Sequence, residues 1–208
     1  MPASEFSIIV ANATAKGHYD TAMSRYAEFA RAAVNTNSRE EPTKFQELLA
    51  LGIPIITHLA LAIEFQLKIL HFQHNGTYPR GHDIAQLGNG FPESTLTDLR
   101  NTYRATYTDP AKPDFLYMTI SEAGYEHASP TERLAGPETY DEAIVRVGRS
   151  YERWRYIYEE FGTTREVSLD FMPLVVLTKT INYCVGHYKG NRKVGIKDEN
   201  FRVGAGEA

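Results

Sequence analysis

Apolar residues recur at three- and four-residue spacing along much of the chain, which is the spacing of one face of an α-helix. The first such stretch lies between Gly17 and Val34 and includes Tyr19, Ala22, Met23, Tyr26, Ala30 and Ala33. The polar stretch from Asn35 to Pro42 then predicts a loop. Upstream, the apolar run from Phe6 to Val10 is too short for its pattern to indicate helix or strand.

A second helical region is expected from about Thr43 to Asn75, with Gly76 stopping it. Its inner face carries Leu59, Ile63, Leu67 and Leu70. Gly52 and Pro54 are expected to divide this region, because an interior proline removes a hydrogen bond and clashes with the preceding turn.

Shorter elements follow. A brief helix should begin near His82 and Asp83, and another should open at Pro92 with Leu96, Leu99, Tyr103 and Tyr107 in step. Residues 113 to 137 are the least regular part of the chain, and we expect at least one short helix among them.

The strongest periodicity begins at residue 138 and includes Tyr140, Ile144, Val147, Tyr151, Trp154, Tyr158 and Phe161, with Gly162 in a capping position. An extended piece over 167–169 precedes a last helix, which Asp170 should cap and which tolerates Pro173 in its first turn. That helix buries Leu174, Leu177, Ile181, Cys184 and Tyr188, and Gly190 should end it.

Strand-like alternation is almost absent, so the predicted fold class is all-α, a bundle of about five main helices. The length of 208 residues fits a single α-helical domain over 1–190, followed by a polar tail over 191–208.

Composition narrows the class of protein. With 22 basic and 26 acidic residues the net charge is −4, so the chain as a whole does not attract nucleic acid, although a local basic patch could. The lone Cys184 is expected to be a buried small hydrophobe. With one cysteine no intrachain disulfide can form, which is compatible with a reducing compartment. The stretch from Leu48 to Ile63 falls short of the roughly 18 unbroken apolar residues of a membrane span. No signal peptide is evident, so we expect a cytoplasmic protein without a membrane segment.

Two polar groups could carry chemistry. In the first, Glu64 and Lys68 share one helix face, and the simpler interpretation is a surface i,i+4 salt bridge. Asp83 could be only a helix cap, and His82 could bond only to backbone. The alternative is that Glu64, Lys68, Arg80 and His82 converge across the turn as a polar site.

The second group lies between Arg149 and Glu160. It could be a solvated helix face in which Arg155 pairs with Glu159. Alternatively, its arginines form a wall that grips phosphate, because a guanidinium matches phosphate oxygens bidentately.

The order A-x-x-x-E-x-x-x-K, G-H-D-I-x-x-L and W-R-Y-x-Y-E resembles the HEPN superfamily of small α-helical bundles, over about residues 53–188. The resemblance implies either a dimeric, metal-independent ribonuclease of toxin–antitoxin and antiviral systems, or a non-catalytic relative that binds nucleotides, nucleic acid or a partner protein. In the ribonucleases four to six residues separate an arginine from the histidine that follows it, and none of the seven histidines here has an arginine at that spacing. The resemblance therefore favours a binding module.

Three hypotheses stay open: a HEPN-like binding module, a ribonuclease with a divergent site, and a structural oligomerisation bundle. A homodimer fits all three. The ligand-binding site of the first comprises Glu64, Lys68, Arg80, His82, Asp83, Arg153, Tyr156 and Glu159. In the second, His82 is the acid or base, and Arg153 or Arg155 stabilises charge on phosphate.

No cofactor is expected, because the chain has neither a phosphate-binding loop nor a dinucleotide-binding glycine motif. No metal is expected either. His71 and His74 are suitably spaced ligands with His82 nearby, but no acid or cysteine completes a zinc set.

Overall fold

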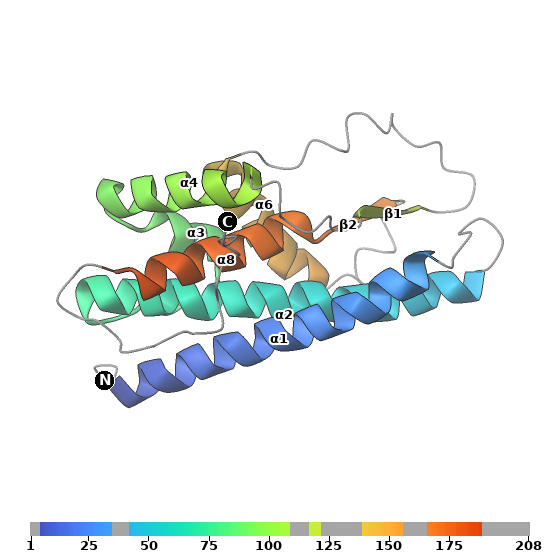
Figure 1. Ribbon diagram of the computed structural model, residues 1–208, viewed down its shortest axis with the longest axis horizontal. Helices are drawn as coiled ribbons and strands as arrows, with labels where there is room; N and C mark the ends of the chain where they lie inside the picture. The colour runs from blue at the N-terminus through green and yellow to red at the C-terminus, as the bar shows by residue number, and fades with distance from the viewer. Residues whose placement is uncertain (1–4, 35–41, 109–116, 122–138, 156–165, 189–208) are drawn as a thin grey trace, which may run out of the picture.

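The structure is a computed structural model that describes residues 5–34, 42–108, 117–121, 139–155 and 166–188. It is an all-α bundle, as predicted. The described residues form six helices, five of them long, together with two short strands (Figure 1).

The longest elements, α1 (Glu5–Val34) and α2 (Pro42–Asn75), run antiparallel side by side (Figure 1). The most buried residues of α1 recur every seven positions, at Ile8, Ala15, Ala22 and Phe29. A seven-residue repeat keeps one seam of a helix facing its partner. The helix runs straight through Gly17, so the run from Phe6 to Val10 belongs to it. Burial of the seam offsets the cost of about 1 kcal/mol that an interior glycine imposes.

Helix α2 is also continuous, and the expected division at Gly52 and Pro54 was wrong. Proline removes the hydrogen bond to the carbonyl of Ala50, but Ala50 is exposed, so water can satisfy that group. Apolar side chains on both sides of the proline are buried, including Leu48, Ile55, Ile56 and Leu59. Packing therefore keeps the helix whole.

A second group of helices lies over α2: α3 (Ile84–Asn89), α4 (Glu93–Thr108) and α6 (Tyr140–Arg155). Their positions confirm the predicted helices. The predicted faces are buried at Leu96, Leu99, Tyr103, Tyr140, Ile144 and Val147. Tyr151 and Trp154 belong to α6, but their side chains lie outside the described residues, as do Tyr158, Phe161 and Gly162.

Helix α8 (Met172–Gly186) packs against α2, α4 and α6 and is buried almost all round. Gly186 ends it, not Gly190, and His187 stands at the C-cap. Two buried amides of α2 join it: Gln66 Nε2 donates to Asn182 Oδ1 at 3.2 Å, and Gln73 Nε2 donates to the Val185 carbonyl at 3.0 Å. These bonds fix how α8 sits along α2.

Strands β1 (Tyr117–Ser121) and β2 (Glu166–Asp170) pair antiparallel, with Tyr117 opposite Asp170. The extended piece at 167–169 was thus predicted correctly. Within 113–137 the described residues form β1 rather than a helix, and the others lie outside the described residues.

Asp170 does not occupy the N-cap of α8, because Phe171 stands there. The Asp170 carboxylate nevertheless accepts a hydrogen bond from the Met172 N–H and lies 3.4 Å from Arg146 Nη2. Burial raises the pKa of Asp170, and these two partners oppose that rise.

One described helix, over Glu47–Asn75, is long and apolar enough to cross a membrane. Half of its apolar window is buried inside the bundle, and the core helix of a soluble protein passes the same test.

Gly17 and Gly148 both lie inside helices, but substitution by alanine should change the free energy of unfolding in opposite directions. A Cβ on Gly148 would lie 2.7 Å from Ala85 Cβ and 2.9 Å from its backbone nitrogen, whereas nothing lies within 4 Å of Gly17. We expect Gly148→Ala to lower the free energy of unfolding by about 1–3 kcal/mol. Gly17→Ala should raise it by up to about 1 kcal/mol. Urea denaturation measures both, and equal effects would contradict the close packing of α6 on α3.

Candidate functional site

The turn between α2 and α3 depends on two glycines with positive φ. Gly76 (φ 71°) ends α2, and its N–H donates to the Phe72 carbonyl at 2.8 Å. Gly81 has a φ of 145°, which residues with a Cβ rarely adopt. Together they turn the chain so that α3 packs back against α2.

Asp83 fixes the start of α3. Its backbone is extended, and Oδ1 accepts a hydrogen bond from the Gln86 N–H at 2.9 Å. This is the N-cap geometry that satisfies a free amide of the first turn. The cap holds the preceding residue, His82, at the edge of α2.

Glu64 brings the first polar group together. Its Oε1 accepts hydrogen bonds from Lys68 Nζ at 2.7 Å and from His82 Nδ1 at 2.8 Å. The side chain of Glu64 is 4% exposed, that of Lys68 15% and that of His82 68%. The interpretation as a surface salt bridge was therefore wrong: the i,i+4 pair exists, but its carboxylate is buried.

The Glu64 carboxylate also sets the hydrogen on His82. A carboxylate oxygen only accepts, so Nδ1 of the ring carries the hydrogen it donates. Nε2 takes no part in this bond and belongs to a side chain that is largely exposed. A carboxylate that orients a histidine in this way leaves the second nitrogen ready for a ligand or a proton.

The second oxygen of Glu64 is unusual. Oε2 is buried and has no hydrogen-bond partner among the described residues. A buried carboxylate is costly unless its lone pairs are satisfied. The site therefore keeps a strong acceptor beside Lys68 and His82.

The turn exposes two further side chains. Arg80 is exposed, and Tyr78 is 43% exposed, one of the few large apolar side chains that are. Sequence interpretation missed Tyr78. Its place between Gly76 and Gly81, where neither helix nor strand could bury it, was the available signal.

The α6 part of the predicted site is less complete. Arg153 and Arg155 belong to the last turn of α6, but their side chains lie outside the described residues, and so do Tyr156 and Glu159. The α6 backbone does approach α3, since Gly148 abuts Ala85, three residues after His82. That the α6 arginines, Tyr156 and Glu159 share a site with His82 stays a prediction.

Two histidines near the end of α2, His71 and His74, are engaged elsewhere. His71 Nε2 bonds the Leu87 carbonyl at 2.9 Å, and its ring stacks on Phe91. His74 bonds Thr95 Oγ1 at 2.9 Å and Tyr188 Oη at 3.4 Å. Burial lowers the pKa of both rings. Within the described ranges, no three His, Cys, Asp or Glu side chains gather where they could hold a metal ion.

Cys184 fits the packing role expected of it. Its half-buried Sγ lies 3.8 Å from Thr102 Oγ1, and burial raises the pKa of the thiol to about 11. A thiol with that pKa stays protonated at neutral pH and is a poor nucleophile.

No protein-family model, curated protein or solved structure matches this chain. The resemblance to the HEPN superfamily therefore rests on the quoted residues alone and stays a prediction.

Removal of the Glu64 charge should show how much this carboxylate contributes to the stability of the fold. Glu64→Gln keeps the shape but leaves Lys68 and His82 facing a neutral amide. We expect the free energy of unfolding to fall by about 1–3 kcal/mol. Asp20→Asn removes the carboxylate of the exposed i,i+4 pair with Lys16 and should cost less than about 1 kcal/mol. Urea denaturation compares the two, and equal losses would contradict a special role for Glu64.

Proposed function

We propose that the turn between α2 and α3 binds a phosphate-bearing ligand, a nucleotide or a short single-stranded nucleic acid. The observation that carries the proposal is the exposed ring of His82, held at Nδ1 by the buried Glu64 carboxylate. A ring fixed in advance loses little entropy when its other nitrogen meets a ligand.

Arg80 and Tyr78 supply what such a ligand requires. An exposed guanidinium binds phosphate oxygens bidentately. An exposed aromatic ring stacks on a base of any sequence. All three side chains lie within five residues of one turn, so a single nucleotide can contact them together. Lys68 is engaged by Glu64 and adds positive charge at the base of the site.

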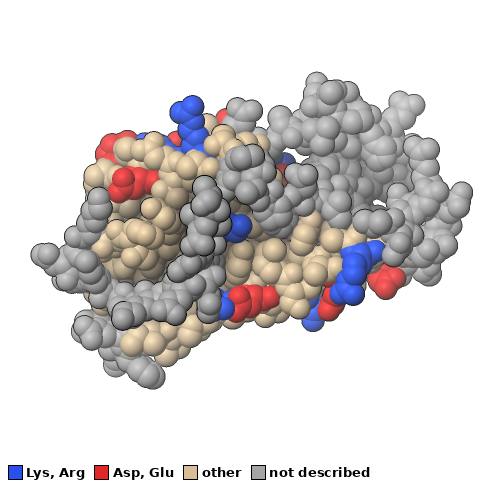
Figure 2. Space-filling view, viewed as in Figure 1, with Lys and Arg blue, Asp and Glu red and all other residues tan. Residues whose placement is uncertain are grey.

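The charge distribution favours a small ligand over a long duplex. Among the residues drawn in colour, Figure 2 shows Lys and Arg side chains interspersed with Asp and Glu on the face in view. The net charge is −4. Proteins that follow a nucleic-acid backbone over many phosphates present a continuous basic surface. A local site one turn wide suits a nucleotide or a strand end.

The proposed setting follows from the HEPN resemblance. We place such a module in the cytoplasm, as a homodimer, in a prokaryotic defence or toxin–antitoxin system with a partner protein.

Binding should depend on the turn. We expect His82→Gln and Arg80→Gln each to weaken binding of ADP or a labelled oligoribonucleotide about tenfold, equivalent to about 1.4 kcal/mol. Tyr78→Ala should weaken both nucleotide ligands and leave binding of inorganic phosphate unchanged. Isothermal titration calorimetry measures all three. Arg104→Gln on α4 and Arg31→Gln near the end of α1, both at exposed positions outside the turn, are the matched controls. Equal loss in the controls, or no binding by the folded wild type, would contradict the proposal.

A divergent ribonuclease is the second candidate, and the Glu64–His82 pair favours it. A histidine oriented by a carboxylate can transfer protons through its other nitrogen. In chelator, RNA cleavage should fall at least about 100-fold in His82→Ala, the usual contribution of an acid–base group. Arg153→Ala tests the predicted arginine. Activity that survives in His82→Ala would point to a contaminating nuclease and against this candidate.

A further inference from the structure

Two histidines meet in the seam between α1 and α2, away from the turn. His18 Nδ1 lies 2.8 Å from His58 Nδ1, with ring centroids 5.1 Å apart. The His18 ring also stacks on Phe65 of α2. The pair sits between the buried seam residues Ala15 and Ala22, so it lies in the middle of the α1–α2 contact.

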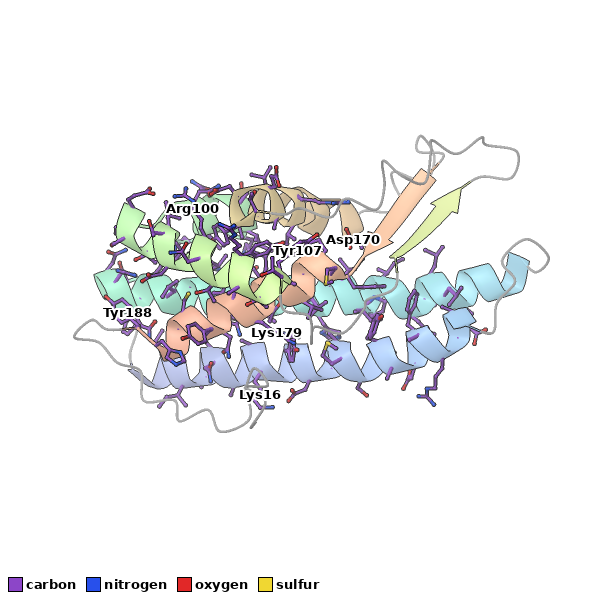
Figure 3. All side chains as sticks on the ribbon, turned by 45° about the horizontal axis from the view of Figure 1, so that its top comes forward. Lys16, Arg100, Tyr107, Asp170, Lys179 and Tyr188 are labelled. Atoms are coloured by element: carbon purple, nitrogen blue, oxygen red, sulfur yellow. The ribbon has the colours of Figure 1, made fainter. Side chains whose placement is uncertain are left out.

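Helix α1 depends on this contact. Among the described elements, α2 is its main partner, as Figures 1 and 3 both show. Near its end, Tyr26 and Phe29 also pack edge-on against Phe171. A change in charge in the middle of the seam therefore affects the packing of a helix whose main partner is α2.

The hydrogen bond between the rings allows only one proton at their meeting point. One Nδ1 must donate and the other must accept with its lone pair. If both rings are protonated, two N–H groups face each other at 2.8 Å, and two positive charges meet in a partly buried seam. The contact then becomes repulsive.

The surroundings do not offset that repulsion. Arg25 of α1 adds positive charge, and Lys16 holds the nearby Asp20 carboxylate in an exposed ion pair. On α2, Glu64 already binds Lys68 and His82. In the view of Figure 3, Lys179 lies at the edge of α8 that is nearer to α1, and it adds a further positive charge. No carboxylate among the described residues bonds either ring.

We propose that the His18–His58 pair is a pH-sensitive latch that holds α1 on α2 when at least one ring is neutral and releases it when both are protonated. With only two histidines at hand and no third ligand among the described residues, the pair acts through protons rather than a metal.

The direction of the pH dependence follows from linkage. Burial, His18 and Arg25 lower the pKa of His58 below its ordinary value of 6.5. The released state therefore binds more protons than the docked state, so docking weakens as pH falls below about 6.5. One proton changes the docking equilibrium by up to about tenfold per pH unit.

Hydrogen–deuterium exchange of the full chain tests the latch. We expect protection factors of the α1 amides, corrected for intrinsic exchange, to fall about tenfold between about pH 6.5 and about pH 5.5, while α4 changes much less. His18→Gln and His58→Gln each keep a polar side chain but remove one titrating ring. Both should abolish most of the α1-specific fall.

His71→Gln is the matched control, because His71 is also buried with a lowered pKa but lies outside the seam. It should retain the α1 response. Circular dichroism at neutral pH checks that each variant is folded. The latch is overturned if α1 protection does not change with pH in the wild type, or if the fall persists unchanged in both seam variants.

Discussion

Burial of α2 is the constraint on which the rest of the structure depends. This helix is apolar around most of its circumference, and α1, α3, α6 and α8 all pack against it. Because so much of it is buried, several polar residues on it bond partners from other elements. His58 meets α1, Gln66 and Gln73 meet α8, and Glu64 meets the turn before α3. The helix thus decides where polar chemistry can occur inside the bundle.

Much of the fold could be predicted from the sequence because helical periodicity is a local signal. The inner face of α2, the start of α3 at Asp83 and the buried face of α4 all follow from spacing and capping. The errors arose where tertiary packing overrides local preference. Gly17 and Pro54 lie inside continuous helices because burial on either side outweighs their local cost. Phe171 rather than Asp170 is the N-cap of α8, because Asp170 is the last residue of a paired strand.

The contacts of Glu64 with Lys68 and His82 could be predicted from the sequence, but the burial of Glu64 could not. Residue spacing placed Glu64 and Lys68 on one face and His82 at the next helix start. It could not show that Glu64 is buried, because burial depends on how the turn folds back over α2. That burial changes the chemistry: a surface carboxylate would be screened by water, whereas this one orients a histidine. The His18–His58 contact joins residues forty positions apart, and no local pattern indicates it.

The shortness of α3 has a consequence for ligand binding. Six residues are too few to form a stable helix alone, because helix nucleation is costly. Helix α3 forms only against α2 and α6, where Ile144 and Tyr140 surround Gly88. The segment that presents His82 therefore depends on the packing of α3 against α2 and α6. A ligand bound there would select molecules that have already completed their folding, and its binding energy would be added to the stability of the whole bundle.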